Sequence, residues 1–176
     1  IDMSFSIEVL RAKKGDCLLI HSTENGDPKY GLIDGGPGGV YQQFLKPHLE
    51  QMRDSLGANA PLKLEYVMIS HVDDDHINGI LDLLNDIDDD RNSQHPEKVR
   101  IRRIWHNSFD NIIGNRPDEL RDSITAQFGA ASYGGQPPDD PEISHDAAMI
   151  LASIRRGQQL RDLAMKLTIP VNIDTQ

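Results

Sequence analysis

The chain has 176 residues, a length typical of one domain, and its 28 acidic against 18 basic side chains give a formal net charge of −10 at pH 7. With 38% apolar and 26% charged residues, the composition fits a globular protein and excludes an intrinsically disordered one. No apolar run approaches the roughly 18 residues that a membrane helix needs, so we expect no membrane partner. The single cysteine excludes an internal disulfide and suits the cytoplasm, where we expect the protein to act.

The first part of the sequence predicts three strands that end in a glycine-rich loop. Apolar residues alternate with polar ones at Phe5, Ile7 and Val9, as along one face of a strand. The third strand ends in Asp-Gly-Gly-Pro-Gly-Gly at 34–39, where glycine lets the backbone approach another group closely. Strands are predicted at 5–9, 17–20 and 30–33, with turns at 13–16 and 24–28.

The middle of the chain predicts a helix, a strand, a second helix and a further strand. Apolar residues recur at helical spacing over 41–56, where Pro47 would kink the helix, and again over 77–87. The acidic run 86–92 is expected to be a solvated loop. Strands are predicted at 64–70 and 99–105. This element order indicates α/β (α+β) layering.

The last part of the chain is expected to be mainly helical. A Gly/Pro-rich loop is predicted over 129–141, and Ser144 would cap a helix that runs to about Arg156. Gly157 would interrupt this helix before a further apolar helix face. A short strand is predicted to begin at Ile169.

The strongest functional signal is Ser-His-Val-Asp-Asp-Asp-His at 70–76, between a predicted strand and a predicted helix. His71 and Asp73 share one face if this segment is extended, while Asp75 and His76 belong to the turn into the helix. Imidazole suits zinc, iron or nickel, and carboxylate shifts the preference towards manganese or magnesium. The alternative is a capped acidic turn, because aspartates are favoured before a helix. Two histidines and three aspartates within six residues favour a metal site.

Two further groups are candidates for substrate contacts. His106 and Asn107 follow the predicted strand 99–105 and would face the metal or the substrate if that strand ends at the same sheet edge. The alternative is a polar loop above Trp105. Arg100 and Arg102 share one strand face and could bind phosphates. Charged residues also protect exposed sheet edges, and this interpretation is favoured over phosphate binding.

The segment 70–76, which is followed by Asn-Gly, resembles the metal motif of the metallo-β-lactamase superfamily, His-x-His-x-Asp-His. Asp73 stands in place of the second histidine, as in the domains attached to DNA-uptake competence proteins. The segments 15–20 and 32–36 are similar to the second and third strands of that fold. Asp34 matches the early aspartate that buttresses the metal loop.

The resemblance implies a four-layer αββα sandwich with a site for one or two divalent metal ions, Zn²⁺ or Mn²⁺. His71 and Asp73 would hold one metal, and Asp75 and His76 the second, with a bridging water or hydroxide as nucleophile. Asp75 and His76 would thus be the catalytic residues. Asp34, His106 and Asn107 would support the site or contact the substrate.

The implied activity is metal-dependent hydrolysis, with phosphodiester cleavage by a nuclease as the first expectation and nucleic acid as the substrate. The alternatives are hydrolysis of a small lactone, thioester or amide on the same metals, or a non-catalytic interaction module of the same fold. Because the chain is acidic, a polyanionic substrate would need metal ions or a local basic patch.

The resemblance also implies a division of the chain. Residues 3–128 would form the N-terminal half of a metallo-β-lactamase-like domain, and 129–176 a Gly/Pro loop and helical extension. No second sheet is recognisable after Trp105, and a single sheet with helices on one face would leave its other face open. We therefore expect a complementary C-terminal half beyond Gln176, as a separate chain or a cleaved fragment.

Overall fold

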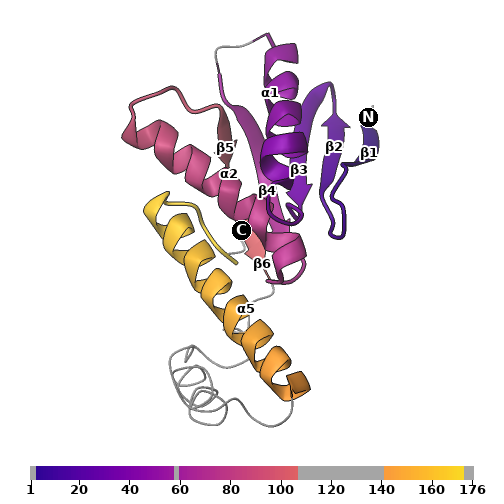
Figure 1. Cartoon of the computed structure of the whole chain (residues 1–176). Helices are drawn as coiled ribbons and strands as arrows, with labels where there is room; N and C mark the ends of the chain where they lie inside the picture. Colours follow the sequence, from indigo (N-terminus) through magenta and orange to yellow (C-terminus); the bar gives the residue numbers. More distant parts are fainter. Residues whose placement is uncertain (1–2, 58–59, 107–140, 173–176) are drawn as a thin grey trace.

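The strands of this protein form one mixed six-stranded sheet, described by a computed structural model that covers residues 3–57, 60–106 and 141–172 (Figure 1). The strands are β1 (Met3–Val9), β2 (Leu18–Glu24), β3 (Asp27–Ile33), β4 (Leu62–Ile69), β5 (Val99–Ile101) and β6 (Ile104–His106). The helices in these residues are α1 (Lys46–Ser55), which follows the π-helical turn η1 (Tyr41–Leu45), α2 (Asp74–Asn92) and α5 (Pro141–Lys166). The α+β class expected from the element order is confirmed.

The sheet combines an antiparallel meander with parallel crossovers. β1, β2 and β3 pair antiparallel, and the β2–β3 hairpin turns at Asn25 and Gly26, both with positive φ as a type I′ turn requires. β4 pairs in parallel with β3 on one side, and with β5 and β6 on the other. The helices of the crossovers therefore connect strands whose carboxyl ends meet at one edge of the sheet.

The hydrophobic core lies between the sheet and α1 and α2. Leu19, Leu32, Val67 and Ile104 point inward from four strands and are fully buried. α5 packs against α2, and Val171 beyond it forms a parallel bridge with Ile104. This bridge agrees with the short strand predicted at the end of the chain.

The opposite face of the sheet, here called the outer face, carries an apolar row that crosses five strands. The paired residues of this row are Val9, Leu18, Ile33, Met68 and Trp105. Val9 is 74% exposed, Met68 42% and Trp105 43%, so the described part of the chain leaves much of this row uncovered. Among residues 3–57, 60–106 and 141–172, no helix covers this outer face.

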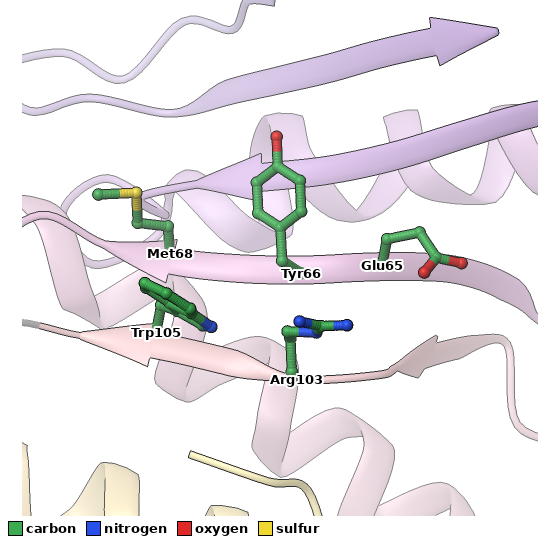
Figure 2. Close-up of a pocket in the computed structure, with 5 residues that line it drawn as sticks. All are labelled: Glu65, Tyr66, Met68, Arg103 and Trp105. Carbon is green, nitrogen blue, oxygen red and sulfur yellow. The ribbon is translucent and has the colours of Figure 1, made fainter. Parts of the chain in front are cut away.

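A second row beside the first runs through Ile7, Ile20, Gly31 and Tyr66. Gly31 has no side chain, and the ring of Tyr66 occupies that space: a Cβ on Gly31 would lie 2.3 Å from Tyr66 Cζ. The side chains of Tyr66, Met68, Trp105, Arg103 and Glu65 line a hollow of about 410 Å³ on this face (Figure 2).

The predicted loop at 86–92 is wrong, because α2 continues to Asn92. The apolar stripe of this helix extends through Leu84 and Ile87, which are buried. Asp86 accepts hydrogen bonds from Tyr41 Oη (2.7 Å) and Lys46 Nζ (3.0 Å), so part of the acidic run is tied to η1 and α1. The acidic run 86–92 is therefore helical, and the apolar side of this helix packs in the hydrophobic core.

The predicted interruption at Gly157 is also wrong, because α5 runs without a break through this residue. Gly157 is buried, and a Cβ on it would lie 4.0 Å from Val72 Cγ1, an ordinary contact, so the helix continues through this position without obstruction. The strand predicted at 99–105 is divided into β5 and β6, which both pair with β4. The boundary predicted between residues 128 and 129, and most of the loop predicted at 129–141, lie outside the described residues.

Within the ranges that the structure describes, no helix combines the length and the apolar character that crossing a bilayer requires.

Candidate metal centre

The segment 70–76 lies where the sequence predicted it, between the end of β4 and the start of α2. We call residues 71–76 the metal loop. Asp34 follows β3, and His106 is the last residue of β6. The neighbouring parallel strands β3, β4 and β6 therefore place polar residues at one edge of the sheet. The strands that position these side chains are held by the buried core beneath them.

Asp34 is the buried carboxylate that anchors the site through hydrogen bonds. It adopts the left-handed conformation (φ 56°), which Asp tolerates better than most residues, and this turns the chain away from β3. The residue is only 2% exposed, and its carboxylate accepts three hydrogen bonds. The donors are Ser70 N (2.8 Å) and Ser70 Oγ (2.6 Å), together with His76 Nδ1 (2.9 Å). A buried carboxylate needs such partners to offset its lost hydration.

These bonds set the protonation of both histidines of the loop. His76 Nδ1 faces a carboxylate that only accepts, so this nitrogen carries the proton. The Ser70 hydroxyl donates to Asp34 and therefore accepts from His71 Nδ1, 3.0 Å away. In the neutral form of each ring, Nε2 then carries the lone pair, and the two ring centroids lie 3.7 Å apart. This is the tautomer in which histidine binds metals, with its other nitrogen anchored by a second group.

Two groups of potential ligand atoms share His76. In the first, atoms of His71, Asp75 and His76 all lie within 4.8 Å of one another, and His76 Nε2 is 3.7 Å from Asp75 Oδ1. The second group joins His76 to Asp34 and Asp16, which is 4.0 Å from His76 Nδ1. A cation there would compete with the proton between His76 and Asp34. The first group leaves that bond intact, so it is the better cation site.

Asp16 was not among the residues predicted from the sequence. It belongs to the turn between β1 and β2, which packs directly on the metal loop: a Cβ on Gly15 would lie 1.6 Å from the carbonyl oxygen of Asp75. The signal that could have found it is the pair Gly15-Asp16, since a glycine beside an acidic residue marks a close backbone approach. Lys13 and Lys14 of the same turn are exposed next to the site.

Two other glycines bring the loop after β3 against α2. A Cβ on Gly79 would lie 1.9 Å from the carbonyl oxygen of Gly35. Gly35 N donates to His76 O (2.7 Å), and Gly79 N donates to Gly36 O (3.1 Å). The close approach expected of the glycine-rich loop is confirmed, and its partner is the first turn of the helix that carries His76.

Asp73 lies outside both groups of ligand atoms. Its Oδ2 is 3.7 Å from His71 Nε2, but its Oδ1 accepts a hydrogen bond from Ser153 Oγ of α5 (2.9 Å). The structure thus places His71 with Asp75 and His76, whereas the resemblance implied that His71 and Asp73 hold one metal and Asp75 and His76 another. The contact with Ser153 had no signal in the sequence, because 80 positions separate the two residues.

The remaining candidates lie around this centre in different ways. His106 is buried at the end of β6, where its backbone N–H donates to Asn172 Oδ1 (2.9 Å), and it belongs to neither group of ligand atoms. Asn107 lies outside the described residues. Arg100 donates to Glu97 and Arg102 to Glu65, so these arginines form ion pairs on the surface of the sheet.

Comparison with protein-family models, with curated proteins and with solved structures finds no match to this chain.

Proposed function

We propose that this chain carries the cation-binding part of a metal-dependent hydrolase of the metallo-β-lactamase type, acting in the cytoplasm. The observation that carries the proposal is the pair of imidazoles whose Nδ1 atoms are hydrogen-bonded to Asp34 and Ser70, beside Asp75. Ligand atoms of His71, Asp75 and His76 all lie within 4.8 Å of one another. If the segment were only an acidic turn that caps α2, the hydrogen bonds of Asp34 and Ser70 to the two histidines would not be required. The motif at 70–76 supplies the resemblance, and the network supplies its physical support.

The donor set fits a divalent cation. His71, His76 and Asp75 would hold it, and the two nitrogens with one carboxylate oxygen suit Zn²⁺ or Mn²⁺. A bound cation would lower the pKa of a water molecule and polarise the bond to be cleaved. Asp34 holds the proton on His76 Nδ1 and fixes the ring, and Ser70 does the same for His71. Asp16 belongs to the second group of ligand atoms, and Asp73 lies beside His71 outside both groups.

Phosphodiester cleavage is the substrate class that we place first. The competence-type motif suggests it. Lys13 and Lys14 are exposed in the turn whose Gly15 packs against Asp75, and they would supply the local basic patch that an acidic chain needs for a polyanion. Hydrolysis of a lactone, thioester or amide on the same cation is the rival activity. An interaction module without a cation is the rival from another class.

The proposal is tested by titrating the metal-free chain with Mn²⁺ and Zn²⁺ in a calorimeter, and by assaying a phosphodiester, DNA, RNA and a lactone with each metal. We expect His76→Ala to abolish cation binding and activity, because it removes one ligand and the group that Asp34 orients. His95→Ala is the matched control, since His95 is exposed after α2. Equal binding by wild type and His76→Ala would refute the site, and a wild type without affinity for either metal would favour the interaction module.

We further propose that a second β-sheet, supplied by the complementary half of the sandwich, covers the outer face. The support is the apolar row from Val9 to Trp105, which spans five strands and matches the flat apolar surface by which two sheets pack face to face. The charges on this face place a further requirement on the partner. Arg103 lines the hollow beside Tyr66 and Trp105 (Figure 2). Glu65 is paired with Arg102, and Arg103 forms no ion pair within the described residues. The covering sheet should therefore place a carboxylate over Arg103.

Trp105 is the only tryptophan and reports directly on this surface. We expect acrylamide to quench its fluorescence strongly in the chain alone, and weakly once the partner sheet is bound. Met68→Asp should abolish that protection, while Met165→Asp on the exposed side of α5 should leave it unchanged. A monomer that binds cation, hydrolyses substrate and keeps Trp105 accessible to quencher would refute the covered face. Concentration-dependent protection in the chain alone would instead identify a second copy as the occupant.

A further inference from the structure

α5 contacts the metal loop through one face of its central turns. Ser153 Oγ donates to Asp73 Oδ1 (2.9 Å). Arg156 Nε donates to Asn78 Oδ1 (3.0 Å) and its Nη2 to Asp74 Oδ2 (2.8 Å). Residues 153, 156 and 157 share a helix face, because positions three and four apart are neighbours on a helix.

The contact of Ser153 is directed at the loop and not at its own helix. A serine within a helix commonly bonds the carbonyl four residues earlier, yet this buried hydroxyl donates to a carboxylate of another segment. The bond occupies Oδ1 of Asp73 and leaves Oδ2, which lies 3.7 Å from His71 Nε2. The Ser153 hydroxyl therefore fixes which carboxylate oxygen of Asp73 lies nearest to His71 Nε2.

Arg156 acts on the charge of the loop. Asp73, Asp74 and Asp75 are consecutive carboxylates whose mutual repulsion would spread the loop apart. The planar guanidinium of Arg156 engages both oxygens of Asp74, an arrangement that Lys cannot reproduce. It removes Asp74 from competition for a cation and holds that side chain away from the Nε2 atoms.

We infer that Ser153 and Arg156 are positioning residues for the metal loop, so that α5 sets the geometry in which His71, Asp73 and Asp75 meet a cation. Where it concerns cation affinity, this inference rests on the proposed function. Where it concerns the order of the loop, it stands on the contacts alone. Groups that orient metal ligands typically change metal affinity about 10- to 100-fold when removed.

The test uses the 176-residue chain and the variants Ser153→Ala and Arg156→Ala. Arg155→Ala is the matched control, because Arg155 is exposed on the same helix. Backbone hydrogen exchange of residues 70–78 is measured without metal, and affinities for Mn²⁺ and Zn²⁺ are measured by calorimetry on the same samples. We expect both variants to exchange at least about 5-fold faster in this segment and to bind cation at least about 10-fold more weakly, with Arg155→Ala like wild type.

Unchanged exchange in both variants would overturn the inference, as would equal acceleration by Arg155→Ala. If wild type binds neither cation, the proposed function fails. The exchange measurement still decides the inference in that case, since faster exchange of residues 70–78 in the two variants supports the positioning role of α5 without any metal.

Discussion

Replacing Gly79 by alanine tests whether the close approach between α2 and the loop after β3 is required. In an exposed helix interior this change stabilises by about 1 kcal/mol, because alanine is the better helix former. Here the new Cβ would lie 1.9 Å from the carbonyl oxygen of Gly35, and contacts below 3.0 Å essentially never occur. The first turn of α2 and the loop must therefore separate, and the oxygen that obstructs is backbone.

The separation would weaken two backbone hydrogen bonds, Gly35 N to His76 O and Gly79 N to Gly36 O, each contributing about 1 kcal/mol. Forcing an extra methyl into a packed contact costs about 1–3 kcal/mol more. After the helix-propensity gain, the net loss is about 2 kcal/mol. For a chain of this size that corresponds to a melting temperature lower by about 4–8 °C.

Thermal unfolding followed by circular dichroism measures this effect, with Gly157→Ala as the matched control. Gly157 is also within a helix, but its Cβ would be 4.0 Å from Val72 Cγ1, an ordinary contact. We expect Gly157→Ala to raise the melting temperature slightly and Gly79→Ala to lower it. A Gly79→Ala protein that melts at or above the wild-type temperature would refute the close approach.

Three further predictions concern titratable side chains. Burial raises the pKa of Asp86, but hydrogen bonds from Lys46 and Tyr41 outweigh it and hold the pKa below its ordinary 3.8. The ionised Asp86 therefore stabilises the fold above about pH 4, and this stabilisation is lost as the pH falls further. Asp86→Asn should lower the urea midpoint of unfolding at pH 7 and lower it much less at pH 3. An equal decrease of the midpoint at both pH values would contradict this prediction. Burial, together with the charge of Asp34, raises the pKa of Cys17 to about 12. A thiol reagent at pH 8 should therefore label Cys17 only after the protein has unfolded. Prompt labelling of the folded protein would contradict this, because it would show that the thiol is accessible. Asp34→Asn should weaken Mn²⁺ binding at least about 10-fold by calorimetry, and unchanged affinity would remove Asp34 from the site.

The sequence predicts the sheet and the position of the site well, because both depend on local patterns. Alternating Phe5, Ile7 and Val9 mark a strand whatever its neighbours are. The apolar run before Ser70 and the periodic run after His76 place the metal loop between a strand and a helix. Asp34 lies beside the loop, where His76 Nδ1 donates to it; the expectation that it supports a metal site comes from the resemblance, not from spacing, and remains a prediction.

What the sequence could not predict depends on contacts between distant segments. Nothing near Ser153 indicates that its hydroxyl will meet Asp73. Gly15 beside Asp16 permits a close backbone approach, but the local sequence does not identify Asp75 as the partner. The helical character of 86–92 was hidden for a related reason, since Asp86 is held by groups on η1 and α1. Local polarity is a poor guide where tertiary partners satisfy the charge.

The contact between α5 and the metal loop also has a consequence for the order of folding. β1, β2 and β3 pair within residues 3–33, whereas Ser153 and Asp73 are 80 positions apart. Short loops close at lower entropic cost than long ones, so the meander is expected to form early and α5 to dock late. During synthesis, the six strands of the described sheet emerge from the ribosome before α5. Competence to bind a cation would then be acquired only once α5 has docked on the metal loop.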